Sequence, residues 1–153
     1  ICCDIGAGTG SVTVEMALAA YQGHVYALDK NEAALELVRA NCRQFHIGNV
    51  STILGDAPSA LAQLPPCEAA FIGGSAGRIS GIVAALLAKN PHTRIVANAV
   101  TLESLHAVTE ALTCHGLMVE VVQISVNKTT AVGGLKLLTA QNPVFIISGG
   151  GNE

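Results

Sequence analysis

The chain has 153 residues and a formal net charge of −3, and half of its residues are hydrophobic although only 3% are aromatic. This size and composition predict a single domain over residues 1–153, with a core of Ala, Val, Leu and Ile as in a parallel sheet covered by helices. The weak negative charge argues against general binding to nucleic acid, and no apolar run is long enough to cross a membrane without Gly, Pro or charge.

The cysteines and the first residue bear on where the protein works and how the chain begins. The five cysteines have no metal-ligand spacing, so we expect free thiols, no bound metal and a reducing, cytoplasmic location. No signal peptide is visible. Because Ile1 already lies in an expected strand and no initiator Met precedes it, we expect an N-terminal segment to be missing.

The first predicted elements are a strand over residues 1–5, a glycine-rich turn and a helix from Ser11 to Ala20, for which Ser11 is a plausible cap. The turn comprises Gly6, Ala7, Gly8, Thr9 and Gly10. Glycine readily takes positive φ and lets the backbone approach a ligand closely, and the start of a helix offers unpaired N–H groups to oxygen atoms. We therefore expect a ligand on this turn, and a tight turn without a ligand is the alternative.

The residue before the turn separates two classes of cofactor. The spacing is Asp-x-Gly-x-Gly-x-Gly, whereas dinucleotide-binding sites use Gly-x-Gly-x-x-Gly. The carboxylate of Asp4 would repel a pyrophosphate but attract the ammonium of a methionyl group. The turn resembles the first motif of S-adenosylmethionine-dependent methyltransferases, which makes a nucleotide-binding oxidoreductase the weaker alternative.

The second predicted strand, residues 25–28, ends at Asp29, and an amphipathic helix follows from Asn31 to about His46. Asp29 lies about 20 residues after the glycine turn, where nucleotide-binding units place the carboxylate that binds the ribose hydroxyls. Capping of the next helix is the alternative. Asp29 and its neighbour Lys30 are both included in the predicted cofactor site.

The third predicted strand, residues 50–54, leads to Asp56 and Ala57. A carboxylate at this position can accept a hydrogen bond from the exocyclic amine of adenine, with the Ala57 N–H facing a ring nitrogen. A turn or helix cap before Pro58 would explain Asp56 nearly as well.

The fourth predicted strand, residues 67–72, ends in a second glycine-rich tip, Gly73–Gly77, expected beside the first strand. The tip lacks the Asn/Asp-Pro-Pro-aromatic run of methyltransferases that act on exocyclic amines or on glutamine. Further on, we expect a helix over 79–87, a strand over 94–100, a helix over 102–114 capped by Thr101, and strands over 117–126 and 142–148. The polar stretch from Asn127 to Lys136 is expected to be a functional loop.

The chain resembles one known family in four stretches: ICCDIGAGTGSVTVEMA, FIGGSAG, RIVANAVTLESL and GGLKLLTAQNPVFIIS. The family is the precorrin-6Y C(5,15)-methyltransferase (decarboxylating) family of cobalamin biosynthesis, and the resemblance is to the subunit or domain that methylates carbon 15. It covers nearly the whole chain, and FIGGS and NAVTLES are its most specific parts.

This resemblance implies a class I S-adenosylmethionine-dependent methyltransferase fold. That fold is a Rossmann-like α/β structure with helices on both faces of a seven-stranded, mostly parallel sheet of order 3-2-1-4-5-7-6, whose last strand is antiparallel. The resemblance also implies a homotetramer and a carbon-5 methylating partner subunit or domain. The implied reaction transfers a methyl group from S-adenosylmethionine to carbon 15 of a precorrin or cobalt-precorrin and removes carbon dioxide from its ring C acetate.

The resemblance places functional residues on this sequence. Asp4 and the glycine turn would hold the methionyl part of S-adenosylmethionine, Asp29 its ribose, and Asp56 with Ala57 its adenine. Gly73 and Gly74 would line the methyl-transfer side, and Asn98 would face the substrate. The predicted substrate site also includes the cations Arg78, Lys128 and Lys136, which could meet carboxylates but could equally be surface charges, and the loop residues Gly133 and Gly134.

We assign no side chain to acid–base catalysis, because the macrocycle itself supplies the nucleophile for methyl transfer. Two alternatives stay open at this point. One is a class I methyltransferase that acts on another small molecule or on tRNA. The other is a non-catalytic nucleotide-binding domain.

Overall fold

The computed structural model describes residues 1–75 and 77–151, so Ala76 of the predicted second glycine-rich tip lies outside the described residues. In chain order the elements are β1 (Cys2–Ile5), α1 (Ser11–Ala19), β2 (Val25–Asp29), α2 (Glu32–Gln44), β3 (Val50–Leu54), the 3-10 helix η1 (Ser59–Gln63), β4 (Ala69–Ile72), α3 (Ile79–Lys89), β5 (Arg94–Ala99), α4 (Leu102–Thr113), β6 (Val119–Ile124), β7 (Asn127–Val132), β8 (Leu135–Ala140) and β9 (Val144–Gly149).

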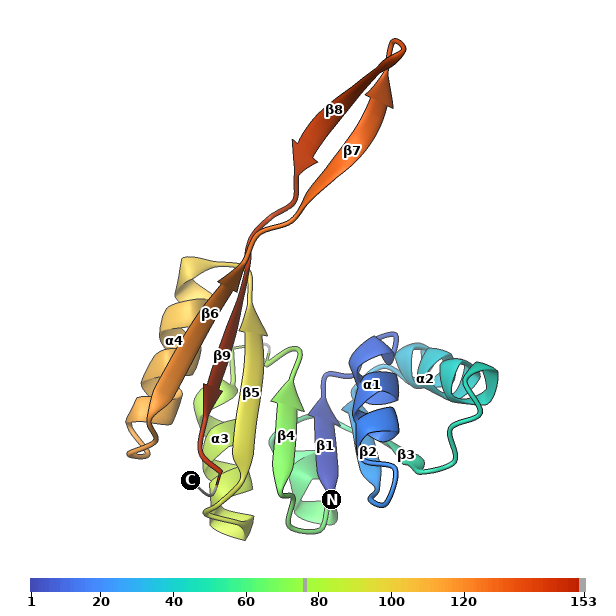
Figure 1. The fold of residues 1–153 in the computed structure, drawn as a ribbon. Coiled ribbons are helices and arrows are strands. Elements are labelled where there is room, and N and C mark those ends of the chain that lie inside the picture. The colour runs from blue at the N-terminus through green and yellow to red at the C-terminus, as the bar shows by residue number, and fades with distance from the viewer. Residues whose placement is uncertain (76, 152–153) are drawn as a thin grey trace.

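Seven of these strands form one sheet in the order β3-β2-β1-β4-β5-β9-β6 (Figure 1). Neighbouring strands from β3 to β5 are parallel, and β9 is antiparallel to both β5 and β6. Parallel neighbours need a connection that crosses a face of the sheet, which is why helices alternate with these strands. The predicted strand order and the antiparallel last strand are confirmed, with β9 as the last strand.

The helices cover the two faces of the sheet. Helix α2 packs against α1, β2 and β3, whereas α3 packs against η1 and α4, and α4 packs against β5 and β9. Side chains alternate along β2 accordingly: Ala27 packs with Val38 and Cys42 of α2, while Leu28 joins the larger cluster on the other face. The predicted core of small aliphatic residues between a sheet and its helices is confirmed.

Helices α4 and α1 differ in how their first, unpaired N–H groups are capped. Thr101 caps α4 as predicted, because its Oγ1 accepts a hydrogen bond from the Ser104 N–H at 3.1 Å. The prediction for Ser11 is wrong: Gly10 precedes α1 with φ 82° and no side chain caps this helix. A Cβ on Gly10 would lie 2.9 Å from Val38 Cγ2, so the close packing of α1 on α2 requires glycine there.

The predicted loop from Asn127 to Lys136 is wrong, because β7 and β8 pair as an antiparallel hairpin in this region. Its two-residue turn is Gly133-Gly134, both with positive φ (55° and 81°), which matches the twist of the strands. We call residues 127–140 the arm. In Figure 1 the arm stands beyond the carboxyl end of β6, clear of the helices and of the rest of the sheet.

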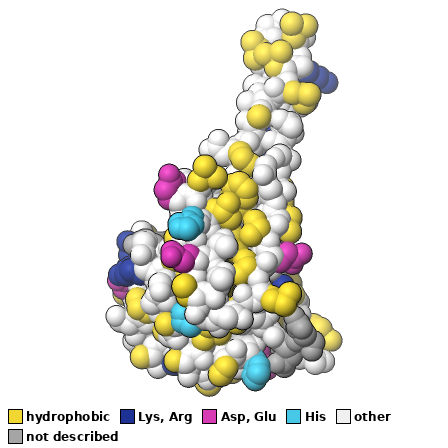
Figure 2. Space-filling model, turned by 90° about the vertical axis from the view of Figure 1, so that its left-hand side faces the viewer, with side chains coloured by type: hydrophobic (Ala, Val, Ile, Leu, Met, Phe, Trp, Pro, Cys, Tyr) yellow, Lys and Arg dark blue, Asp and Glu magenta, His cyan; other side chains and the backbone are white. Residues whose placement is uncertain are grey.

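Hydrophobic side chains are exposed along β6 and the arm. They gather on the edge of the molecule that carries β6 and continue into the arm (Figure 2). This set consists of Val121, Val122, Ile124, Val126, Val132, Leu135, Leu137 and Leu138. Among the described strands, β7 and β8 pair only with each other, and an isolated two-stranded hairpin is marginally stable in water.

No helix in residues 1–75 and 77–151 is both long enough and apolar enough to cross a membrane. The five cysteines are free thiols; Cys3, Cys42 and Cys67 are buried, whereas Cys114 is exposed.

Candidate active site

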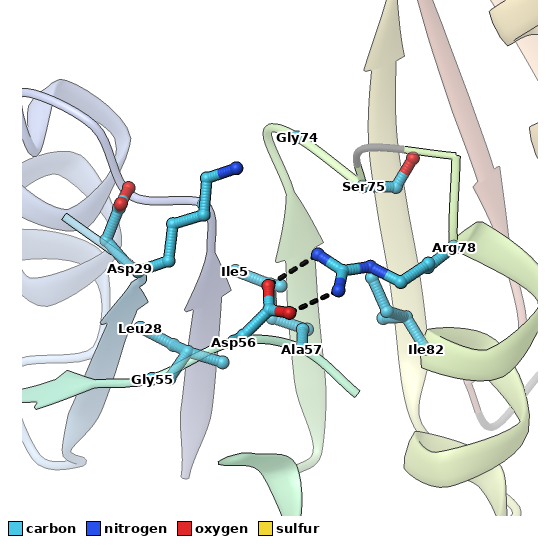
Figure 3. A pocket seen from close by; sticks show the side chains of 12 residues that line it. Ile5, Leu28, Asp29, Gly55, Asp56, Ala57, Gly74, Ser75, Arg78 and Ile82 are labelled. Carbon is cyan, nitrogen blue, oxygen red and sulfur yellow. Dashed lines mark hydrogen bonds and ion pairs between the residues drawn. The ribbon is translucent and has the colours of Figure 1, made fainter. Parts of the chain in front are cut away.

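The carboxyl ends of β1 to β4 meet at one edge of the sheet and enclose a cavity of about 300 Å³, the first cavity (Figure 3). Six of the residues predicted to bind the cofactor line it together: Gly6, Asp29, Lys30, Asp56, Ala57 and Gly74. Its floor and walls are otherwise mostly apolar, with Ile5, Leu28 and Ile82. An apolar cavity of this size with a few polar groups at its rim is typical of a small-molecule site.

The two glycine-rich tips touch each other at this edge. A Cβ on Gly6, where φ is 75°, would lie 2.9 Å from the Gly74 nitrogen, so a side chain has no room between the tips. The Gly6 and Ala7 N–H groups both donate to the Leu28 carbonyl, at 2.8 and 3.1 Å, and fix the turn against β2. Gly8 differs, because its Cβ position is open and no atom lies within 4 Å.

Asp29 links the turn to the start of α2. Its Oδ2 accepts a hydrogen bond from the Gly8 N–H and its Oδ1 accepts one from the Asn31 N–H, both at 2.9 Å. The cap of α2 is Asn31, whose side chain accepts from the Ala33 N–H. A carboxylate has about four acceptor positions, so Asp29 keeps free lone pairs for hydroxyl groups in the first cavity.

Asp4 lies under the turn and does not line the first cavity. It is 1% exposed, and its Oδ2 accepts a hydrogen bond from Thr13 Oγ1 at 2.5 Å. Burial raises the pKa of this carboxyl to about 6, against the opposing effect of the Thr13 hydrogen bond. Its Oδ1 is buried and has no hydrogen-bond partner among the described residues. Such an orphaned acceptor fits a site that receives a donor from a ligand or a water molecule.

Asp56 and Arg78 form a bidentate ion pair across the first cavity (Figure 3). The two hydrogen bonds from Arg78 hold the pKa of Asp56 below its ordinary value. The prediction grouped Arg78 with the substrate residues, but its guanidinium lies in the first cavity, beside the predicted adenine-binding carboxylate. The predicted substrate role of Arg78 stays a prediction.

A second cavity of about 540 Å³ adjoins the first and shares Gly74 and Ser75 with it. It lies between the β4 tip, the end of β5 and the start of α4, and includes Gly73 and Asn98 as predicted. Glu103 and Ser104 of α4 also line it, and the sequence reasoning missed them. The signal was available, because both follow the carboxyl end of a predicted parallel strand, at the edge where ligands bind.

Nine predicted site residues lie in neither cavity: Asp4 and Gly8, described above, and seven others. Within the turn, Ala7, Thr9 and Gly10 support its shape: the Thr9 carbonyl accepts a hydrogen bond from Asn41 Nδ2, and Gly10 packs on Val38. The other four are exposed residues of the arm: Lys128, Gly133, Gly134 and Lys136. These four lie on the hairpin of the arm and line neither cavity of their own chain, so their predicted substrate role stays a prediction.

With this geometry described, comparison with known proteins decides the family. The family model of the precorrin methyltransferase domain matches residues 1–149. The chain belongs to the precorrin methyltransferase family. Members of this family are similar over nearly the whole chain, which spans about three quarters of their length. A probable cobalt-precorrin-6B C(15)-methyltransferase (decarboxylating) of Pyrobaculum calidifontis is 43% identical over 147 residues, which are 95% of this chain and 75% of that protein.

Solved structures of precorrin-6Y methyltransferases are also similar to this chain. Precorrin-6y C5,15-methyltransferase from Geobacter metallireducens has a TM-score of 0.89 and 38% identity, covering 99% of this chain and 78% of that one. The C-terminal domain of the Rhodobacter capsulatus precorrin-6Y C5,15-methyltransferase has a TM-score of 0.84 and 34% identity, covering 97% and 79%. A more distant structure, a SAM-dependent O-methyltransferase from Thermotoga maritima, is 15% identical with a TM-score of 0.76 and shares the class I fold.

The residues of the first cavity fit S-adenosylmethionine, the methyl donor of this fold class. The cavity offers a carboxylate at each of two strand ends, an apolar slot between them, and a glycine cradle that a Cβ would fill. The buried, unpaired Oδ1 of Asp4 adds an acceptor beneath the turn. Among the described residues no group of three or more His, Cys, Asp or Glu side chains is arranged to hold a metal ion.

Proposed function

We propose that this chain transfers a methyl group from S-adenosylmethionine to carbon 15 of a precorrin or cobalt-precorrin and removes carbon dioxide from the ring C acetate. The names of the similar proteins state this activity for them. The observation that carries the proposal here is the pair of carboxylates, Asp29 and Asp56, on one cavity that opens at Gly74 into a second, larger cavity.

We assign the first cavity to the adenosyl part of the methyl donor, which supplies an electrophilic methyl group on sulfur. In this assignment Asp29 accepts from the ribose hydroxyls, and Asp56 with the Ala57 N–H faces the adenine edge. Lys30 flanks the ribose, and the turn from Gly6 to Gly10 with Asp4 beneath it holds the methionyl part.

The second cavity is assigned to the macrocycle, with Gly73 and Gly74 between donor and acceptor. Glycine at this boundary lets the two reactants approach closely, because neither Gly73 nor Gly74 carries a side chain. Methyl transfer is a single displacement for which the protein mainly supplies orientation and exclusion of water. Asn98 at the end of β5 is placed to donate to or accept from polar groups of the macrocycle.

We further propose that the chain works as a homo-oligomer, a tetramer as the family resemblance implies, assembled through the arm. The arm and β6 present exposed apolar side chains that the chain's own helices leave uncovered. Lys128 and Lys136 are the only ionisable side chains of the arm, so the arm carries a charge of +2 in a chain whose net charge is −3. A second copy therefore offers it complementary charge.

This assembly bears on the predicted substrate role of Lys128, Lys136 and the turn Gly133-Gly134. The arm leads away from the cavities of its own chain, so these residues meet substrate only where the arm of one copy reaches the second cavity of another. Replacing residues 127–140 with a short glycine linker tests the assembly, because the Gln141 N–H bonds the Val126 carbonyl at 2.8 Å and the two ends are adjacent. Light scattering should then give a monomer, and an unchanged oligomer would refute this interface.

We also propose where the protein acts and what it does not bind. We place the protein in the cytoplasm, acting as one methyltransferase domain over residues 1–153 and without binding nucleic acid or a membrane. A separate subunit or domain would methylate carbon 5.

The test of the main proposal is an assay of the purified protein with S-adenosylmethionine and cobalt-precorrin-6B, followed by mass analysis of the tetrapyrrole and measurement of released carbon dioxide. The proposal predicts a product that has gained one methyl group and lost carbon dioxide. Methylation of tRNA or of another small molecule without turnover of the tetrapyrrole would refute it. Binding of NADH without affinity for S-adenosylhomocysteine would also refute it.

A further inference from the structure

Glu103 stands out in the second cavity, because no other lining residue among those described is ionisable. It lies in the first turn of α4, one of the two helices that border this cavity. Thr101 caps the helix and fixes its start directly after β5. The position of Glu103 is therefore determined by the sheet, at the edge where the substrate is proposed to bind.

Positive charge is missing from the same cavity. None of the eight lysines and arginines of the chain lines it, and no histidine does. Two cations, Lys30 and Arg78, line the adjoining first cavity, where Arg78 is paired with Asp56. A carboxylate that enters the second cavity of a single chain thus meets a like charge and no cation.

A like charge beside a carboxylate has two chemical consequences. It disfavours the charged ground state, and loss of carbon dioxide relieves the repulsion because the electron pair moves into the conjugated macrocycle. It also places a second carboxyl group, which can carry and release a proton, next to the reacting group.

We propose that Glu103 is the proton donor in the decarboxylation, an inference that rests on the proposed function. The bond between the acetate methylene carbon and its carboxyl carbon breaks, carbon dioxide leaves, and the electron pair of that bond passes into the macrocycle. The Glu103 carboxyl then gives its proton to the methylene carbon, which becomes a methyl group, and Glu103 is left as a carboxylate. Solvent returns the proton for the next turnover, so no oxidant or reductant is needed.

Methyl transfer to carbon 15 makes a different demand. It forms a carbon–carbon bond by displacement at the methyl group and needs no proton donor. Removal of the acid should therefore separate the two halves of the reaction, a result that a merely structural role of Glu103 would not produce.

The experiment compares Glu103→Gln with Glu110→Gln in the full chain. Glu110 lies on the same helix, is exposed and lines neither cavity, and its Oε2 lies 3.8 Å from His106 Nε2. Each variant is incubated with S-adenosylmethionine and cobalt-precorrin-6B. Methyl incorporation, released carbon dioxide and the mass of the tetrapyrrole are measured together, and melting temperature and affinity for S-adenosylhomocysteine report on the fold and the first cavity.

We expect Glu103→Gln to keep its melting temperature, its affinity for S-adenosylhomocysteine and its methyl incorporation. Its release of carbon dioxide should fall by about 10²- to 10⁴-fold, the usual contribution of a general acid. The product should then be heavier than the wild-type product by the mass of carbon dioxide. Glu103→Asp, which keeps an acid at this position, should recover part of the lost release.

Two results would overturn the inference. Unchanged release of carbon dioxide by Glu103→Gln would mean that the proton comes from elsewhere. An equal fall in methylation and decarboxylation would mean that Glu103 places the substrate and does not donate the proton. Either result leaves the proposed function standing as long as the wild type and Glu110→Gln methylate and decarboxylate the tetrapyrrole. Failure of all three proteins would instead refute the proposed function.

Discussion

Two alanine substitutions in the glycine turn should separate a structural glycine from a ligand-binding one. Gly6 and Gly8 both have positive φ, at 75° and 55°, so alanine at either position costs about 1–2 kcal/mol of backbone strain. The two positions differ in the room that they leave for a Cβ atom. The Cβ of Gly6→Ala would lie 2.9 Å from the Gly74 nitrogen and 3.0 Å from its carbonyl oxygen, and these backbone atoms cannot yield as a flexible side chain would.

Gly6→Ala therefore adds an overpacking cost of about 1–3 kcal/mol to the strain, which gives a total destabilisation of about 2–5 kcal/mol. Gly8→Ala meets no atom within 4 Å and pays the strain alone. For a domain of this size, each kcal/mol lowers the melting temperature by about 2–4 °C. The melting temperature should fall by about 2 to 8 °C in Gly8→Ala and by about 4 to 20 °C in Gly6→Ala.

Gly8→Ala, the variant with the smaller loss of stability, should still lose affinity for S-adenosylhomocysteine. The open space at Gly8 is where we place the ligand, so the methyl group of Gly8→Ala should weaken binding of S-adenosylhomocysteine at least about tenfold, equivalent to 1.4 kcal/mol. Isothermal titration calorimetry on the folded variant measures this directly. Wild-type affinity in Gly8→Ala would refute the assignment of a ligand to the turn. Equal melting temperatures for the two variants would refute the contact between the glycine tips.

Three further predictions concern the carboxylates. Asp29→Ala should weaken binding of S-adenosylhomocysteine by about 1–3 kcal/mol, and undiminished affinity would remove Asp29 from the site. The raised pKa of Asp4, about 6 against an ordinary 3.8, means that the folded state binds more protons than the unfolded state between these values, so this residue's contribution to stability falls as pH rises from about 4 to 6. Urea unfolding should therefore show that the free energy of unfolding of Asp4→Asn rises relative to that of the wild type between about pH 4 and 6, by about 3 kcal/mol at most. The same pH dependence in both proteins would contradict the burial of the charge. Arg78→Gln should raise the KM for S-adenosylmethionine more than that for the tetrapyrrole, because the ion pair with Asp56 lies in the first cavity, and the reverse ratio would support the predicted substrate role of Arg78 instead.

The sheet and the cofactor edge were predictable from local patterns. A strand, a turn residue and an amphipathic helix alternate through most of the chain, and strand ends in a parallel sheet fall at one edge. This is why Gly6, Asp29, Asp56 and Gly74, far apart in the sequence, could be assigned to a single cavity. The strand over Val50–Leu54 has its predicted bounds, and Thr101 caps its helix as predicted.

The features that were missed depend on contacts between distant residues. Nothing local to Arg78 indicates that its guanidinium pairs with Asp56, 22 residues earlier, and its charge alone suggested the substrate. The cap position of α1 is Gly10 and not Ser11, and only Val38 on another helix shows why glycine is needed there. The arm was taken for a loop because its Gly133-Gly134 turn and polar residues resemble one. Its Thr, Val and Leu content favours strands, but its exposed position leaves no buried face to impose a regular alternation.

The most direct test of the central claim is a crystal structure of this chain with S-adenosylhomocysteine. We expect the ribose hydroxyls on the Asp29 carboxylate, the adenine in the first cavity beside Asp56 and Ala57, and the sulfur at Gly74 facing the second cavity. A ligand bound elsewhere, or a first cavity that stays closed at saturating ligand, would contradict it.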